Sequence, residues 1–192
     1  MKKRLCLVID QERCIGCEAC TVACKIENKA GKRWIRVETE NSANKDTPSG
    51  RFPELKMSFM PRLCNHCENP PCVEACPPEA LQKRDDGPVL LDSKKCDGCQ
   101  NCIEVCPYEA IFYNAEKEQA EKCSLCYHRV DKDLEPFCVI CCEGQAMHFG
   151  DLNDLESVVA GIIASGRAFQ LLPEEGADPL VYYCPPKASR GL

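Results

Sequence analysis

The sequence predicts an α+β fold that has little regular secondary structure and depends on bound metal for its core. Three observations lead to this prediction. Nineteen of the 192 residues are cysteine and only 6% are aromatic, so the apolar core is small for a chain of this length. Sixteen of the cysteines fall into four groups with closely similar spacing. Around these groups a strand, a cysteine loop, a short helix and a second strand recur, which is typical of a ferredoxin-like unit.

The four groups, called quartets here, are distinguished by the gap in their middle. Quartets one and three have the spacing Cys-x2-Cys-x2-Cys-x3-Cys, whereas the middle gap is four residues in quartet two and eleven in quartet four. In chain order the quartets are Cys14, Cys17, Cys20 and Cys24; Cys64, Cys67, Cys72 and Cys76; Cys96, Cys99, Cys102 and Cys106; and Cys123, Cys126, Cys138 and Cys142. In such runs three cysteines bind one [4Fe–4S] cluster and the fourth binds another.

The spacing therefore predicts four [4Fe–4S] clusters with crossed fourth ligands. Quartets two and three are separated by one hairpin length and exchange their fourth cysteines, and quartets one and four do the same around them. The expected ligand sets are Cys14, Cys17, Cys20 with Cys142; Cys123, Cys126, Cys138 with Cys24; Cys64, Cys67, Cys72 with Cys106; and Cys96, Cys99, Cys102 with Cys76. One ferredoxin-like unit (57–115) is then inserted into another (1–56 plus 116–150), and residues 151–192 form a C-terminal helix and docking tail.

Local patterns place the elements around the quartets. The expected strands are Leu5–Ile9, Ala110–Tyr113 and Gln145–Phe149, with a hairpin formed by Ala80–Arg84 and Pro88–Leu91 around Asp85-Asp86-Gly87. The expected helices are Ala19–Asn28, Asn101–Cys106 and Leu152–Arg167, the last from apolar residues at helical spacing. The proline-rich tail from Leu171 is expected to be extended and able to wrap a partner.

Charge and hydropathy exclude several classes of function. The net charge is −6 without a basic stripe, so no nucleic-acid partner is expected. The apolar runs 5–9 and 158–164 are too short for a signal peptide and a membrane span, respectively. We therefore expect a cytoplasmic chain without direct membrane insertion. No phosphate loop or nucleophile–histidine pair is present, so one-electron transfer is the chemistry expected, and no catalysis by the chain alone.

Three segments carry a resemblance to a known family: Cys14-Ile-Gly-Cys17-Glu-Ala-Cys20-Thr-Val-Ala-Cys24-Lys-Ile-Glu-Asn28, Cys64-Asn-His-Cys67-Glu-Asn-Pro-Pro-Cys72 and Lys122-Cys123-Ser-Leu-Cys126-Tyr-His-Arg129. From about Leu5 to Leu180 the chain resembles the four-cluster electron-transfer (beta) subunits of the dimethyl sulfoxide reductase and polysulfide reductase superfamily. The resemblance implies a large catalytic subunit with a molybdenum or tungsten pterin. It also implies a second redox partner, either a membrane anchor or a soluble carrier, and allows export alongside a partner that carries a twin-arginine signal.

The chain departs from the family pattern at one ligand. The fourth quartet usually ends in Cys-Pro, but here Cys141 and Cys142 are adjacent and Glu143 follows. Cys142 keeps the gap of three residues and is the ligand predicted, with Cys141 as the alternative.

Several alternative functions compete with a role as such a beta subunit. The same module could serve a cytoplasmic tungsten enzyme of the aldehyde oxidoreductase type, such as class II benzoyl-CoA reductase, or act as a free polyferredoxin. Less favoured are a zinc-based interaction scaffold and a disulfide framework, the latter because nineteen cysteines cannot all pair.

Some residues near the quartets have less specific roles. His66, His128 and His148 are expected to donate hydrogen bonds around the clusters. Lys25, Lys122 and Arg129 either raise cluster potentials or are merely solvated. Cys6, Cys141 and Cys184 are expected to be buried small residues or inert thiols.

Overall fold

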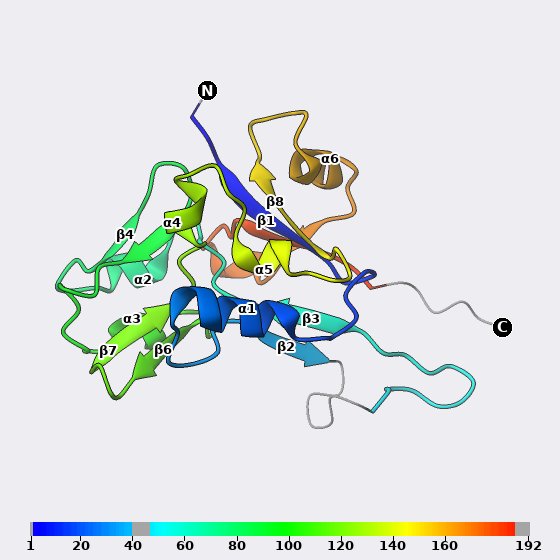
Figure 1. Cartoon of the computed structure of the whole chain (residues 1–192), viewed down its shortest axis with the longest axis horizontal. Helices are drawn as coiled ribbons and strands as arrows, with labels where there is room; N and C mark the ends of the chain where they lie inside the picture. Colours follow the sequence, from blue (N-terminus) through cyan, green and yellow to red (C-terminus); the bar gives the residue numbers. More distant parts are fainter. Residues whose placement is uncertain (1, 40–46, 187–192) are drawn as a thin grey trace.

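The computed structural model describes residues 2–39 and 47–186, and its helices and strands are short and joined by long loops (Figure 1). The strands are β1 Leu5–Asp10, β2 Arg36–Thr39, β3 Phe59–Arg62, β4 Leu81–Lys83, β5 Val89–Leu91, β6 Ile111–Asn114, β7 Gln119–Lys122, β8 Met147–Asp151, β9 Phe169–Gln170 and β10 Val181–Cys184. The helices are α1 Ala19–Asn28, α2 Pro71–Glu74, α3 Asn101–Glu104, α4 Tyr127–Val130, α5 Phe137–Ile140, α6 Val158–Ala164 and the 3-10 turn η1 Pro173–Glu175. The fold is α+β.

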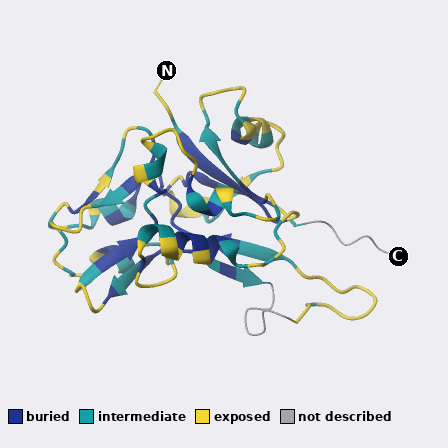
Figure 2. Ribbon diagram, viewed as in Figure 1, coloured by how far each residue is buried: buried dark blue, intermediate teal, exposed yellow. Residues whose placement is uncertain are grey.

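The largest sheet has the strand order β8-β1-β10-β9 and is built around β1. β1 pairs antiparallel with β8 and parallel with β10, so it is an interior strand. Its residues Leu7, Val8 and Ile9 are 0% exposed, and Figure 2 shows the whole strand in the buried colour. A strand buried on both faces has a continuous apolar run in its sequence, which explains why Leu5–Ile9 was recognisable without the structure.

The two faces of β1 pack against different layers. Alternate side chains point to opposite faces of a sheet, and Leu5, Leu7 and Ile9 lie in the core that contains most of the cysteines. Cys6 and Val8 point the other way, toward a smaller core that contains Val159 of α6. The sheet thus separates the cysteine-rich half of the molecule from α6.

The two cysteines in this smaller core behave as predicted for small buried residues. Cys6 and Cys184 are 1% and 0% exposed, and both pack among apolar side chains that include Leu180. Burial raises the pKa of the Cys6 thiol to about 12, which keeps it protonated and unreactive. The burial predicted for these two cysteines is confirmed.

Two hairpins form the opposite end of the molecule (Figure 1). β4 pairs antiparallel with β5 as predicted, and β6 pairs with β7. Side chains of both hairpins pack together in a separate small core. Its buried members include Leu81, Val89, Ile111 and two of the cysteines. The prediction of the first hairpin from Asp85-Asp86-Gly87 is confirmed, and Gly87 has a φ of +123° at the turn.

The C-terminal helix is shorter than predicted. The sequence predicts a helix over 152–167, but α6 begins at Val158 after an N-cap at Ser157, whose side chain accepts the Ala160 N–H. The preceding residues form turns in which the carboxylates of Asp151 and Asp154 accept backbone N–H groups two residues later. Acidic and hydroxyl side chains compete in this way with helix hydrogen bonds, so the helical spacing of the apolar residues extends beyond the helix itself.

The tail also differs from the prediction. Residues Val181–Cys184 do not extend from the molecule: they form β10, inside the main sheet and parallel to β1. The Tyr183 side chain is 0% exposed, and its hydroxyl donates to the Pro61 carbonyl over 3.1 Å. The idea that this stretch wraps a partner is therefore wrong, because it completes the core of its own chain. A docking role for other parts of 151–192 stays a prediction, and 187–192 lie outside the described residues.

Candidate metal centres

The sixteen quartet cysteines lie in four spatial sets, each with three members of one quartet and the fourth member of another. Two sets each surround a cavity, and in the other two the thiols are close enough to raise one another's pKa. We name them set A (Cys14, Cys17, Cys20, Cys142), set B (Cys24, Cys123, Cys126, Cys138), set C (Cys64, Cys67, Cys72, Cys106) and set D (Cys76, Cys96, Cys99, Cys102).

The cavities of sets A and C have the same chemical character. Apart from the cysteines, that of set A is lined mainly by small and apolar residues such as Ile15, Val37 and Met147. The cavity of set C is lined in the same way, for example by Val89 and Ile111. Four sulfur donors around an enclosed apolar space fit a [4Fe–4S] cluster, which cysteine thiolates hold.

The thiols of sets A, B and C are hard to ionise without a bound cation. Burial raises the pKa of Cys20, Cys24, Cys67 and Cys72 to about 12, with neighbouring thiols adding to the effect. The pKa values of Cys123 and Cys138 are raised well above the ordinary value for the same reason. A coordinating metal deprotonates a thiol outright, so iron would supply the positive charge that this arrangement lacks.

One backbone feature recurs in all four quartets. The residue before the second cysteine has a positive φ in each case: Gly16, His66, Gly98 and Leu125. This bend returns the backbone to the preceding cysteine. For example, the Leu125 N–H donates to the Cys123 sulfur over 3.4 Å. Backbone held in this sparsely populated region clusters at functional sites.

A second recurring feature lies after the fourth cysteine. The N–H of the alanine four residues later donates to the cysteine sulfur, from Ala80 to Cys76 over 3.3 Å and from Ala146 to Cys142 over 3.1 Å. A backbone hydrogen bond from Ala110 to Cys106 lowers the pKa of that thiol against the larger effect of burial.

This recurring hydrogen bond to the fourth cysteine distinguishes the two adjacent cysteines of quartet four. Cys142 takes part in it and faces the set A cavity, whereas Cys141 is the C-cap residue of α5 and does not line that cavity.

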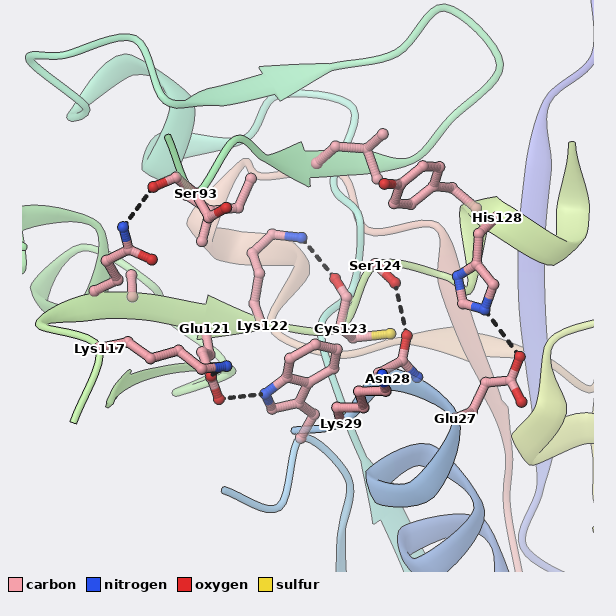
Figure 3. A pocket seen from close by; sticks show the side chains of 16 residues that line it. Glu27, Asn28, Lys29, Ser93, Lys117, Glu121, Lys122, Cys123, Ser124 and His128 are labelled. Atoms are coloured by element: carbon pink, nitrogen blue, oxygen red, sulfur yellow. Dashed lines mark hydrogen bonds and ion pairs between the residues drawn. The ribbon is translucent and has the colours of Figure 1, made fainter. Parts of the chain in front are cut away.

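Asn28 takes the place of the alanine in quartet one, and the sequence reasoning missed it. Its side-chain nitrogen lies 3.8 Å from the Cys24 sulfur and 3.6 Å from the Cys126 sulfur, so it can donate to either within set B. The Ser124 hydroxyl donates a hydrogen bond to the Asn28 side-chain oxygen over 3.2 Å (Figure 3). The position could have been found by aligning the quartets, because Asn28 follows Cys24 by the same four residues.

The four sets follow one another in a row. A thiol of one set raises the pKa of a thiol in the next set at three places: Cys20 raises that of Cys138, Cys64 that of Cys123, and Cys102 that of Cys72. These electrostatic interactions between neighbouring sets give the order A–B–C–D. Among the sixteen cysteines only Cys17 in set A and Cys99 in set D are exposed, so the row reaches the surface at both ends.

The three histidines differ in their surroundings. His66 is 1% exposed, its Nδ1 accepts the Val89 N–H over 3.1 Å, and its protonated Nε2 has no hydrogen-bond partner in the described structure. An orphaned N–H beside set C fits a donor to a bound sulfur-rich group. His128 instead contacts Glu27 at the surface over 2.9 Å, and His148 is half-buried in β8. The donor role stays a prediction for all three.

A pocket opens beside set B, between the end of α1, β7 and α4 (Figure 3). Its wall includes Glu121, a buried carboxylate that accepts hydrogen bonds from Gly31 N–H, Trp34, Asn114 and Lys117 at 2.8–3.4 Å. Burial alone would raise the pKa of Glu121, but these donors outweigh it and the pKa is lowered. Glu121 thus ties the segment after α1 to the β6–β7 hairpin, a structural role that no sequence motif indicated.

The described residues offer no site for a single metal ion. In residues 2–39 and 47–186, no three His, Cys, Asp or Glu side chains are grouped closely enough to hold one metal ion.

Comparison with known proteins agrees with the cysteine pattern. A family model described as a 4Fe-4S dicluster domain matches residues 55–152, and a 4Fe-4S binding domain matches residues 7–26. The first match spans the inner quartets and all of quartet four, and the second contains the first quartet. Both matches support [4Fe–4S] clusters as the cofactors.

Several curated proteins are similar over nearly the whole chain. A Halobacterium salinarum protein, named provisionally as the iron–sulfur B subunit of a dimethyl sulfoxide reductase, is 45% identical over 96% of this chain and 80% of its own length. The B subunit of tetrathionate reductase from Salmonella typhimurium is 42% identical, covering 95% and 72%. The arsenate respiratory reductase iron–sulfur subunit ArrB of a Shewanella species is 34% identical, covering 94% and 95%.

Proposed function

This chain belongs to the iron–sulfur B subunits of the dimethyl sulfoxide, tetrathionate and arsenate reductase type of molybdoenzyme, and from that membership we propose how it conducts electrons. It passes single electrons through four [4Fe–4S] clusters, one in each of sets A to D, to or from a molybdenum- or tungsten-pterin catalytic subunit. The observation that carries the proposal is the grouping of sixteen cysteines into four sets in a row. The chain alone performs no substrate chemistry.

The residues of each set have defined tasks in this proposal. A [4Fe–4S] cluster, when bound, supplies a one-electron couple whose potential depends on charge and hydrogen bonds around it. The cysteine thiolates hold it in place, and the N–H groups of Leu125, Ala80 and Ala146 donate to the ligating sulfurs. Such donors stabilise negative charge on sulfur and favour the reduced state. The apolar lining of the cavities keeps water away.

From the order of the sets we propose a route for the electrons. Electrons move between the exposed ends of the row, near Cys17 and near Cys99, through the buried sets B and C. Ile15, which lines the set A cavity, is 60% exposed, and Val22 and Ile26 on the adjoining helix α1 are 56% and 69% exposed. Exposed apolar side chains in a group mark protein contacts. We infer that the catalytic subunit docks at the set A end and the second redox partner at the set D end.

The division into units follows the same logic. All ligands of sets C and D come from residues 64–106, and all ligands of sets A and B come from 14–24 and 123–142. The pairing of β1 with β8 joins the two outer segments and supports this arrangement. We therefore keep the proposal of an inserted unit at 57–115, an outer unit at 1–56 plus 116–150, and a C-terminal region at 151–192.

The cellular location of the chain is a separate proposal. No helix within the described part of the chain combines the length and apolar character needed to cross a bilayer. The cytoplasmic location predicted from the sequence, with export beside a partner as its alternative, stays a prediction. A membrane anchor would then be supplied by another chain.

The other readings of the sequence have less support. The relatives described above are named as B subunits or iron–sulfur subunits of reductases, which favours a role within a complex over a free polyferredoxin. The 4Fe-4S family matches favour iron over zinc. Neither comparison points to a tungsten aldehyde oxidoreductase-type complex.

Anaerobic purification of the native complex tests the proposed function. We expect about 16 iron atoms per chain, which is four for each of four clusters, and a larger pterin-containing chain at a ratio of one to one. Dithionite-reduced clusters should be reoxidised when the substrate of that larger chain is added. Purification of the chain without any catalytic partner, in a form that carries electrons between unrelated enzymes, would instead identify a free carrier.

The choice between Cys141 and Cys142 gives a further prediction. Cys142→Ser should lower iron by about 4 atoms per chain, because set A loses one of its four thiolates. Cys141→Ser should keep the full iron content, since this side chain lies outside the set A cavity. Iron and acid-labile sulfide analysis of both variants, purified side by side, checks the assignment. Loss of iron in the Cys141 variant alone would reverse it.

A further inference from the structure

Lys122, the last residue of β7, is a buried lysine in the middle of the row of cysteine sets. It is 3% exposed, and its ammonium donates to the Cys123 carbonyl over 2.8 Å and to the Val89 carbonyl. Figure 3 shows its side chain turned away from Glu121 and reaching toward the backbone of Cys123. Lysine is rarely buried to this extent unless its charge is paired.

No carboxylate compensates this charge. The adjacent Glu121 is occupied by Lys117, Trp34, Asn114 and Gly31, and Lys122 forms no salt bridge with any Asp or Glu of the described chain. The two carbonyl oxygens bring partial negative charge only. A buried ammonium without a full counter-charge is strongly unfavourable, so the charge balance of this region is incomplete as it stands.

The position of the ammonium indicates what completes it. One of its acceptors belongs to Cys123 of set B, and the other belongs to Val89, which lines the cavity of set C. Lys122 thus lies between the two interior sets.

The other two basic residues beside ligand cysteines have different surroundings. Lys25 follows Cys24 but is exposed to solvent. Arg129 lies 3.3 Å from the Glu27 carboxylate and its guanidinium stacks 5.3 Å over the Phe137 ring, so its charge is already paired. Of these three cations, only Lys122 is both buried and without a carboxylate.

We propose that Lys122 is a positioning residue for electron transfer, whose ammonium is the counter-charge shared by the clusters of sets B and C. This inference rests on the proposed function. Each one-electron reduction would add one negative charge to the cluster that is reduced, with no bond made or broken and no proton moved. A fixed cation at short range stabilises the reduced state more than the oxidised state. Lys122 therefore holds the reduction potentials of both interior clusters above the values that they would have without it.

Redox titration of the holo-complex, followed by electron paramagnetic resonance, tests the proposal. The variants are Lys122→Gln, which keeps a donor for the carbonyls but removes the charge, and Lys122→Arg, which keeps the charge. In Lys122→Gln two of the four midpoint potentials should fall, each by at least a tenfold change in the reduction equilibrium, which is about 59 mV for a one-electron couple. Lys122→Arg should restore most of this shift. Lys25→Met is the matched control and should move none of them by a comparable amount.

The outcomes separate the inference from the function on which it rests. Four unchanged potentials in Lys122→Gln, with full iron content, would overturn the role of Lys122 alone. Equal shifts in the Lys25 and Lys122 variants would overturn it as well, because a general charge effect would then be responsible. If Lys122→Gln loses iron, the Lys122→Arg variant decides: a tenfold fall in the reduction equilibrium there, despite the retained charge, also contradicts the proposal. Absence of four one-electron clusters in the wild-type complex would contradict the proposed function itself.

Discussion

Replacing Cys138 by alanine should remove one cluster and stop electron transfer between the two ends of the chain. Cys138 is buried and belongs to set B, an interior position in the row A–B–C–D. Its loss leaves three thiolates where four are needed, so iron should fall by about 4 atoms per chain. An electron would then have to cross from set A to set C without the intermediate site. Iron analysis and rapid-mixing reoxidation of the reduced complex measure the two effects.

Cys6→Ala is the matched control for this experiment. Cys6 is also buried, but it packs beside Val8 and Leu180 on the far side of the main sheet. Deleting its sulfur should cost about 1 kcal/mol through the small cavity that is left, with iron content and electron transfer unchanged. Full iron and normal reoxidation in Cys138→Ala would contradict the assignment of Cys138 as a ligand of the cluster in set B.

Gly98→Ala should disrupt set D. Gly98 precedes Cys99 with a φ of +75°, and a Cβ there would lie 2.4 Å from the Glu118 carbonyl oxygen. That oxygen belongs to the backbone of the β6–β7 turn, so the cysteine loop or the hairpin must move. We expect the variant to lose up to about 4 iron atoms per chain and to lose the signal of the cluster at the exposed Cys99 end. Iron analysis after brief exposure to a chelator measures this.

Gly176→Ala separates the clash from the backbone preference. Gly176 has a φ of +66°, but a Cβ would meet nothing within 4 Å. Both substitutions carry the left-handed penalty of about 1–2 kcal/mol for a residue other than glycine, and only Gly98→Ala adds the collision. Similar chelator resistance in the two variants would mean that the approach of Glu118 to the loop is unimportant for set D.

The cysteine loops and helix α1 were predictable because the sequence signals for them are local. Ala19–Asn28 lacks glycine and proline and forms α1 with the predicted bounds. The first hairpin was evident from Asp85-Asp86-Gly87. The spacing of the cysteines also led to the four sets that the structure brings together, because the alternation of loop and helix directs the fourth cysteine away from the first three.

The features that were missed depend on distant parts of the chain. β10 pairs with β1 from the opposite end of the sequence, and its flanking prolines resemble those of a free tail. The start of α6 is set by Ser157 and the preceding aspartates, which the apolar spacing does not reveal. Likewise, burial of Lys122 arises from β5 and set C packing around it. A lysine beside a cysteine looks the same in sequence whether it is solvated, as Lys25 is, or enclosed.

In the proposed arrangement four clusters lie in one row, each held by three cysteines of one quartet and the fourth of another. An anomalous-difference map of the anaerobic complex, collected at the iron absorption edge, tests it directly. We expect four iron peaks in the order A–B–C–D, with Cys142, Cys24, Cys106 and Cys76 each bonded to the cluster of the partner quartet. Fewer than four peaks, or a fourth cysteine bonded to the cluster of its own quartet, would contradict it.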